Sequence, residues 1–174
     1  MYEIGDYIVK SVDGVCRVKD ILHLDLSGTD KNKLYYLLVP LNDEKGKIYM
    51  PTDTNANVRK VMSEEDAWKL IHRIPAIEEI WIDNEKLRER KYKEAVRSCN
   101  PEALIGIIKM TYLRRKERLE KGKKSTVVDE RYFHLAENNL YSELGFALHK
   151  KKEDISRLIT DVVNQKENSF DELQ

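Results

Sequence analysis

Three basic runs in the second half of the chain are the residues best suited to chemistry, and that chemistry is contact with phosphate. They lie at 87–93, 112–118 and 129–133; the first two are rich in Lys and Arg, the third contributes Arg131, and each run carries an aromatic side chain. Trp81 comes shortly before the first run. Clusters of Lys and Arg on one part of a protein are the electrostatic footprint that nucleic-acid backbones select.

The charge of the chain is unevenly distributed. The 174 residues contain 31 Lys and Arg and 31 Asp and Glu, so net charge alone implies no polyanionic partner. Between residues 86 and 124, however, 14 basic side chains face 5 acidic ones, a local excess of +9. One such run is as consistent with a solvated helix face as with binding. Three runs in succession favour nucleic-acid binding.

The sequence offers little support for catalysis, so we do not expect an enzyme, a cofactor or a metal site. Its four histidines show no HExxH spacing, and neither a glycine-rich phosphate loop nor a Gly-x-Ser-x-Gly elbow is present. Cys16 and Cys99 lie far apart and belong to no CxxC pair. This spacing argues against a zinc site or a disulfide framework.

The predicted fold class is α+β, with a small antiparallel barrel followed by helices. Residues 7–60 alternate apolar and polar positions with a period near two, in five short runs separated by turn residues. The alternation is clearest at 15–21. Five short strands in fewer than 60 residues are typical of a Tudor-like or SH3-like barrel. We therefore predict a first domain at 1–61.

A helical period begins after Met62 and predicts a second domain at 62–163. Helix-start signals recur in this segment: Ser63 with Asp66, Asn100 followed by proline, and Thr126 with Asp129. The polar remainder, 164–174, is predicted to be a flexible tail. No window approaches the roughly 20 apolar residues of a membrane span. We expect a cytoplasmic protein without membrane contact, of undetermined oligomeric state.

Several segments together resemble the CarD/CdnL family of bacterial transcription regulators. In the first domain these segments are 5–9, 13–18, 35–37 and 48–51, and in the second they are 113–118 and 140–148. The resemblance covers roughly residues 1–150, in order and with sensible spacing.

The resemblance implies a division of labour between the two domains. Members of the family bind the RNA polymerase β subunit through a Tudor-like domain that is shared with the transcription-repair coupling factor. Their helical domain contacts promoter DNA at the upstream edge of the bubble, mostly at the backbone and minor groove, and a tryptophan wedge helps to hold the open complex. A wedge offsets unstacking by added contacts while basic residues neutralise phosphates.

Candidate residues follow for both partners. Trp81 is the candidate wedge, with packing against Ile77 and Ile80 as the alternative. The other candidate DNA contacts are Arg88, Arg90, Lys91, Lys93, Arg114, Arg115, Arg118 and Arg131. The family resemblance implies a polymerase-binding surface at Leu24, Tyr36, Leu38 and Tyr49. The alternative for these four is that they close the barrel core.

Two functions of different classes fit these predictions. The first is a polymerase-bound regulator that modulates open-complex stability through contacts. The second is a stand-alone nucleic-acid-binding module in which the barrel only supports the helices. Strong binding without polymerase, with a steep salt dependence, would favour the second function.

Overall fold

The computed structural model describes residues 1–25, 27–54, 57–82 and 84–171, with the backbone alone given for 164–171. The chain divides into two compact units, Met1–Val61 and Met62–Gln174. This division falls where the apolar period changes in the sequence. No described helix has the length and apolar character needed to cross a bilayer.

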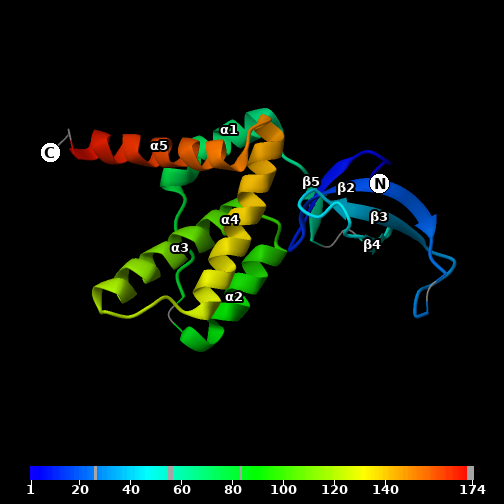
Figure 1. Cartoon of the computed structure of the whole chain (residues 1–174), viewed down its shortest axis with the longest axis horizontal. Helices are drawn as coiled ribbons and strands as arrows, with labels where there is room; N and C mark the ends of the chain where they lie inside the picture. The colour runs from blue at the N-terminus through cyan, green and yellow to red at the C-terminus, as the bar shows by residue number, and fades with distance from the viewer. Residues whose placement is uncertain (26, 55–56, 83, 172–174) are drawn as a thin grey trace. The chain divides into compact units, whose positions relative to one another are not determined.

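The first unit is a five-stranded antiparallel half-barrel (Figure 1). Its strands run in the order β4-β3-β2-β1-β5, which leaves β4 and β5 at the two edges. Their bounds are β1 Tyr7–Lys10, β2 Gly14–His23, β3 Leu34–Pro40, β4 Ile48–Pro51 and β5 Val58–Lys60. The predicted fold class is confirmed.

The barrel core forms on one face of the strands. The buried cluster comprises Ile8, Cys16, Val18, Tyr36, Leu38 and Met50. Neighbouring side chains of a strand point to opposite faces, so Tyr36 and Leu38 of β3 both point inward. The Tyr36 hydroxyl accepts a 2.9 Å hydrogen bond from the Tyr2 N–H, and the two rings meet edge to face with centroids 5.8 Å apart. This contact fastens the N-terminus to the core.

The second unit is all helical. Its elements are α1 Glu64–Arg73, the 3-10 turn η1 Ile74–Ala76, α2 Glu85–Arg97, α3 Pro101–Glu120, α4 Val127–Leu148 and α5 Lys152–Asp171. Helices α2, α3 and α4 pack against one another, and α5 packs against α1, η1 and α4 (Figure 1). One core joins all five helices, with Ile71, Tyr92, Ile107, Leu140 and Ile155 each from a different helix.

The helix starts follow the side-chain caps expected from the sequence. Ser63 Oγ accepts a 3.1 Å hydrogen bond from the Asp66 N–H, and Thr126 Oγ1 accepts one of the same length from the Asp129 N–H. Asn100 Oδ1 accepts from the Glu102 N–H at 2.9 Å, with Pro101 at the first helical position. Each oxygen satisfies one of the donors that a helix start leaves without an intrahelical partner.

The end of the chain differs from the prediction. Helix α5 continues to Asp171, through most of the 164–174 segment that we expected to be a flexible tail. That segment contains neither Gly nor Pro and is rich in Gln, Lys and Glu, which continue a helix readily. Polarity alone therefore did not mark the end of the helix. Residues 172–174 lie outside the described part of the chain.

Candidate nucleic-acid and polymerase interfaces

Arg88 and Arg114 belong to an ionic network that joins helices and runs from the buried Asp129 to the exposed Glu85. Arg88 is only 5% exposed, and its Nη2 donates to Glu85 Oε1 at 2.7 Å. Arg114 Nη2 donates to the same oxygen at 3.2 Å, and its Nε donates to Asp129 Oδ2 at 3.1 Å. Hydrogen bonds, first from Arg88 and then from Arg114, hold the pKa of Glu85 below its ordinary value. The two arginines therefore connect α2, α3 and α4, rather than facing solvent as expected for DNA contacts.

Three further candidate arginines are also engaged within the helical unit. Arg115 Nη2 donates a 2.8 Å hydrogen bond to each carboxylate oxygen of Glu130. Its guanidinium lies 4.9 Å from the Phe133 ring centroid. Arg118 Nε donates to the Lys124 carbonyl at 2.7 Å. Arg131 pairs with Glu89. Such pairing reduces what these side chains can offer to phosphate.

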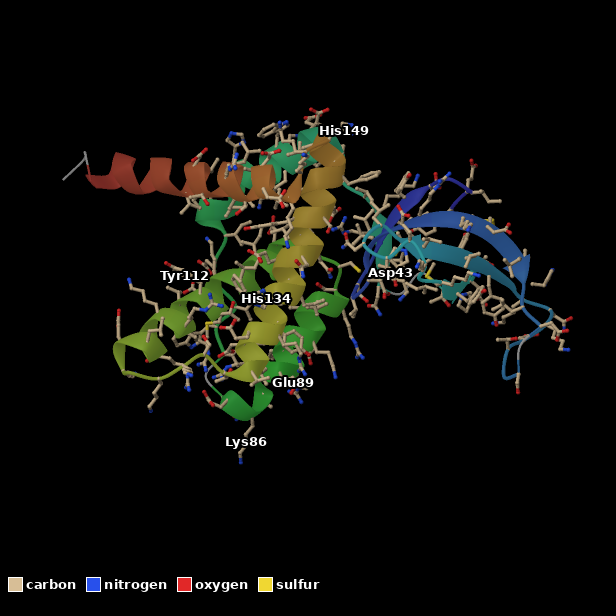
Figure 2. All side chains as sticks on the ribbon, viewed as in Figure 1. Asp43, Lys86, Glu89, Tyr112, His134 and His149 are labelled. Carbon is tan, nitrogen blue, oxygen red and sulfur yellow. The ribbon has the colours of Figure 1, made fainter. Side chains whose placement is uncertain are left out.

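A basic stripe remains on the outer face of α2. We define the α2 stripe as Lys86, Arg90, Lys93 and Arg97, all of which are exposed. Their spacing of four, three and four residues aligns them on one side of a helix, opposite the buried Tyr92. Lys86 extends away from the helical unit at the start of α2 (Figure 2).

The α2 stripe includes two of the predicted residues and two that were missed. Arg90 and Lys93 belong to it, and Arg90 Nε lies 3.6 Å from Glu94 Oε1. Lys91, also predicted, is exposed on the flank of the stripe, 3.5 Å from Glu94 Oε2. Lys86 and Arg97 were not among the predicted contacts, although their helical spacing to Arg90 and Lys93 was a signal present in the sequence.

Trp81 is exposed to solvent between Ile80 and Ile82, two residues that pack on the helical unit. It is 72% exposed, whereas Ile82 is buried in the helical core and Ile80 packs against that core. The Ile80 N–H donates to the Gly106 carbonyl at 3.3 Å. A Cβ added at Gly106 would lie 2.7 Å from Ile80 Cγ1, so glycine is what lets the segment approach α3 so closely.

Lys109 supports the same segment from α3. Its Nζ donates to the carbonyl oxygens of Pro75 and Ile77, which follow α1 directly. The alternative for Trp81, packing between helices, is therefore not what this geometry favours. Trp68, by contrast, is partly buried against the helical core.

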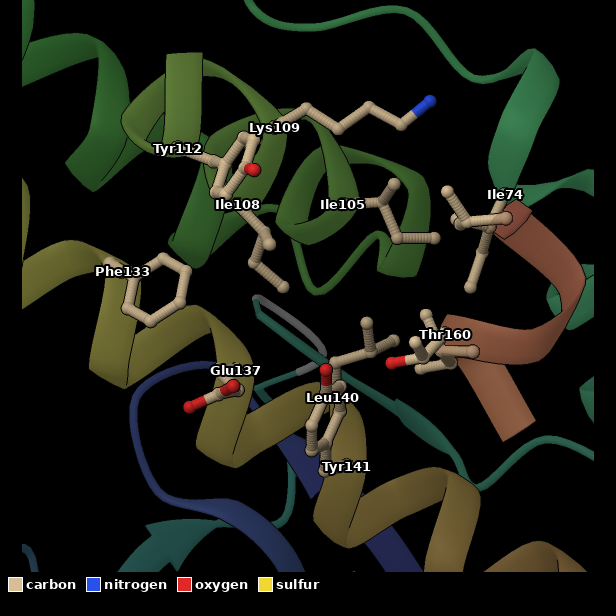
Figure 3. A pocket seen from close by; sticks show the side chains of 12 residues that line it. Ile74, Ile105, Ile108, Lys109, Tyr112, Phe133, Glu137, Leu140, Tyr141 and Thr160 are labelled. Atoms are coloured by element: carbon tan, nitrogen blue, oxygen red, sulfur yellow. The ribbon is translucent and has the colours of Figure 1, made fainter. Parts of the chain in front are cut away.

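A hollow of about 380 Å³ lies among η1, α3, α4 and α5 (Figure 3). Its walls are mostly aliphatic and aromatic, and include Ile105, Ile108 and Leu140. Among its lining residues only Lys109 and Glu137 carry charge, and Lys109 is committed to backbone carbonyls. Within the described part of the chain, no group of three or more His, Cys, Asp or Glu side chains is arranged to hold a metal ion.

The four candidate polymerase contacts are mostly interior. Leu24, Tyr36 and Leu38 are buried, so their side chains form no outer surface. Their burial fits the alternative that these side chains close the barrel core, and their contact with a partner stays a prediction. Tyr49 is 40% exposed on the edge strand β4, opposite Leu37 in the register. It alone of the four offers a side-chain contact surface.

Comparison with known proteins bears on the first unit. Residues 2–62 match the family described as the CarD-like/TRCF RID domain, a range that contains all five strands. The first unit, hereafter the RID domain, is therefore similar to CarD-like/TRCF RID domains over nearly its whole length. The predicted family resemblance is thereby confirmed for this part of the chain. No curated protein matched the chain.

The RID domain indicates one binding partner of the chain. Domains of this family interact with the β subunit of RNA polymerase, so the chain contains a polymerase-interacting domain. Among the strands that the structure describes in the RID domain, β4 pairs with β3 on one side only. The matched range ends where the helical unit begins.

Proposed function

We propose that the chain is a transcription regulator that holds RNA polymerase through its RID domain and promoter DNA through its helical unit. In this proposal the protein modulates the stability of the open complex at initiation. It acts through contacts and not through catalysis. Promoter DNA would be met mainly at the backbone and in the minor groove.

The polymerase contact is assigned to the β4 edge of the RID domain. An edge strand presents unpaired N–H and C=O groups that an extended segment of a partner can join as an additional strand. Tyr49 lies on this strand with its ring partly in solvent. An exposed aromatic beside an open edge supplies the side-chain contact that backbone pairing lacks.

The DNA contact is assigned to Trp81 and the α2 stripe. Four aligned cations on one helix face suit the regular spacing of backbone phosphates, and they position a protein without reading sequence. Trp81 precedes Asn84, the N-cap of α2, by three residues. A large apolar side chain inserted in the minor groove unstacks neighbouring base pairs, and phosphate contacts offset that cost.

The single observation that carries the proposal is the presentation of Trp81. At 72% exposure, Trp81 leaves one of the largest apolar side chains in solvent, where a partner can bury it. Its neighbours Ile80 and Ile82 pack on the helical unit. Less conformational entropy is therefore lost when a partner binds the indole.

The test measures both contacts with the full chain. In a pull-down with the polymerase β subunit, Tyr49→Ala is expected to weaken binding. Leu41→Ala is the matched control because Leu41 is 39% exposed in the same domain. Unchanged binding by folded Tyr49→Ala would remove the β4 assignment. Failure of the wild-type protein to bind β, with strong DNA binding, would favour a stand-alone nucleic-acid module.

The second arm follows the lifetime of open complexes formed by polymerase with the chain. Trp81→Ala is expected to shift that lifetime to the value without the protein while leaving β-subunit binding intact. Tyr112→Ala is its control, since Tyr112 is also an exposed aromatic, at 58%, of the helical unit. Equal effects of the two variants would refute the wedge role of Trp81.

A further inference from the structure

A pocket of about 270 Å³ opens beside Trp81, between the start of α2 and the middle of α3. Its apolar wall is formed by Trp81, Ile82, Met110 and Leu113. Ile82 and Met110 are buried, whereas Trp81 and Leu113 are exposed at the surface. Ile82 and Met110 therefore form an apolar floor, and Trp81 and Leu113 add exposed apolar side chains to the wall.

The polar groups of the pocket balance one another in charge. Arg88 and Arg114 line it together with Glu85 and Glu117, two cations and two carboxylates. A phosphate would gain nothing net from such a set. A planar ligand carrying both donors and acceptors along its edge would suit it, because arginine donates to ring nitrogens and carbonyls while carboxylates accept from amino groups.

Arg88 adds an independent sign that this pocket receives a ligand. Its Nε is the buried side-chain polar atom that lacks a hydrogen-bond partner among the described residues. Among the side chains that the structure describes, the guanidinium is hydrogen-bonded through Nη2 to Glu85. Buried donors are nearly always satisfied, and an exception at the wall of a cavity indicates a missing acceptor.

From these features we infer that the pocket holds one unpaired nucleobase of DNA, stacked on or beside Trp81. This inference rests on the proposed DNA-binding function and deepens it, because it gives the wedge a place for the base that it displaces. A base has two faces for stacking and an edge of donors and acceptors, which matches an apolar floor with a charge-balanced rim. The α2 stripe meanwhile holds the flanking phosphates.

The experiment compares three labelled DNA duplexes that differ at one position. The first is fully paired, the second carries a single bulged adenine or cytosine, and the third carries an abasic bulge of the same length. Affinities of the full chain are measured by fluorescence anisotropy at fixed salt. The abasic bulge keeps the phosphates and the flexibility of the bulge, so it isolates the base itself.

The expected result is that the base bulge binds about tenfold more tightly than the abasic bulge. Leu113→Phe, which fills the pocket from an exposed position, should reduce this ratio to near one. Leu119→Phe is the matched control, because Leu119 is also an exposed leucine of α3 but does not line the pocket. It should retain the ratio.

The remaining outcomes separate failure of the pocket inference from failure of the proposed function. Equal affinities for base and abasic bulges, with paired duplex still bound, overturn the pocket inference and leave the proposed function standing. A tenfold ratio that survives Leu113→Phe places the base elsewhere and also overturns the inference. Failure to bind any of the three duplexes refutes the DNA-binding part of the proposed function, and the pocket inference with it.

Discussion

Tyr92 donates a 3.0 Å hydrogen bond to Asp129 Oδ1, and both side chains are buried. The other carboxylate oxygen of Asp129 accepts from Arg114, and its backbone N–H donates to the Thr126 cap. One carboxylate therefore connects α2, α3 and α4 at the start of α4. Burial and the neighbouring Asp129 charge raise the pKa of Tyr92 well above its ordinary value, which keeps the phenol a donor.

Tyr92→Phe is expected to destabilise the helical unit by about 1–2 kcal/mol, because it removes one donor while Asp129 keeps its Arg114 partner. Urea unfolding followed by tryptophan fluorescence measures the change, and both tryptophans lie in the helical unit. Tyr112→Phe is the control, since the exposed Tyr112 ring lies on the surface of α3. An equal effect of the two substitutions would show that the buried hydroxyl contributes nothing.

Acid should weaken the helical unit through its arginine-bound carboxylates. Hydrogen bonds, from Arg88 to Glu85 and from Ser125 and Arg115 to Glu130, hold the pKa of both carboxyls below their ordinary value. A carboxyl whose pKa is lower folded than unfolded stabilises the fold above the unfolded value and loses that contribution as pH falls. The free energy of unfolding should therefore decline as pH falls below about 5.

Urea unfolding at pH 7 to 3 checks this decline. Glu130→Gln should lower stability at pH 7 and flatten the dependence, because glutamine keeps the shape but does not titrate. Glu137→Gln is the comparison, since Glu137 has no arginine partner among the described residues. A slope that is the same in Glu130→Gln as in the wild type would contradict the assignment.

We expect α3 to need glycine at position 106 only because the Ile80 side chain leaves no room for a Cβ there. Gly106→Ala places a Cβ 2.7 Å from Ile80 Cγ1, and overpacking of this kind costs about 1–3 kcal/mol. In an Ile80→Ala background that atom is gone, and the same substitution should stabilise α3 by about 0.5–1 kcal/mol through helix propensity. A double-mutant cycle in urea measures the coupling. Equal effects of Gly106→Ala in both backgrounds would exclude the contact as the cause.

Helix starts and strands were predicted well from the sequence, because they depend on residues that are close together along the chain. The N-cap oxygens of Ser63, Asn100 and Thr126 act on residues two or three positions ahead, so each helix start could be read from neighbours in the sequence. Strand alternation likewise placed the strands of the barrel. The helix end failed as a prediction, since α5 continues through polar residues that carry no stop signal.

The candidate site was harder to predict, because charge pairing depends on the folded arrangement. Arg114 and Asp129 are 15 residues apart, and Arg131 lies 42 residues from Glu89. A run of cations therefore looks the same in sequence whether carboxylates of a neighbouring helix neutralise it or not. The α2 stripe could have been found, since Lys86 and Arg97 share the helical period of Arg90 and Lys93.

The α2 stripe should dominate the salt dependence of DNA binding. Each phosphate contact releases counterions and steepens the plot of log affinity against log salt by about 0.9. Lys86→Ala with Lys93→Ala should therefore reduce the slope by about 2 and weaken binding to all sequences alike. Fluorescence anisotropy with one labelled duplex at several salt concentrations gives the slope.

The matched control for the α2 stripe is Lys150→Ala with Lys151→Ala. These two lysines are exposed between α4 and α5, next to His149, which lies at the far end of the helical unit from Lys86 (Figure 2). Both double variants lose two positive charges, so a general effect of net charge would lower the two slopes equally. Equal slopes would thus remove the α2 stripe from the interface. A slope that falls only for Lys86 and Lys93 assigns the phosphate contacts to α2, because the remaining cations of the basic runs are mostly bound to carboxylates of their own unit.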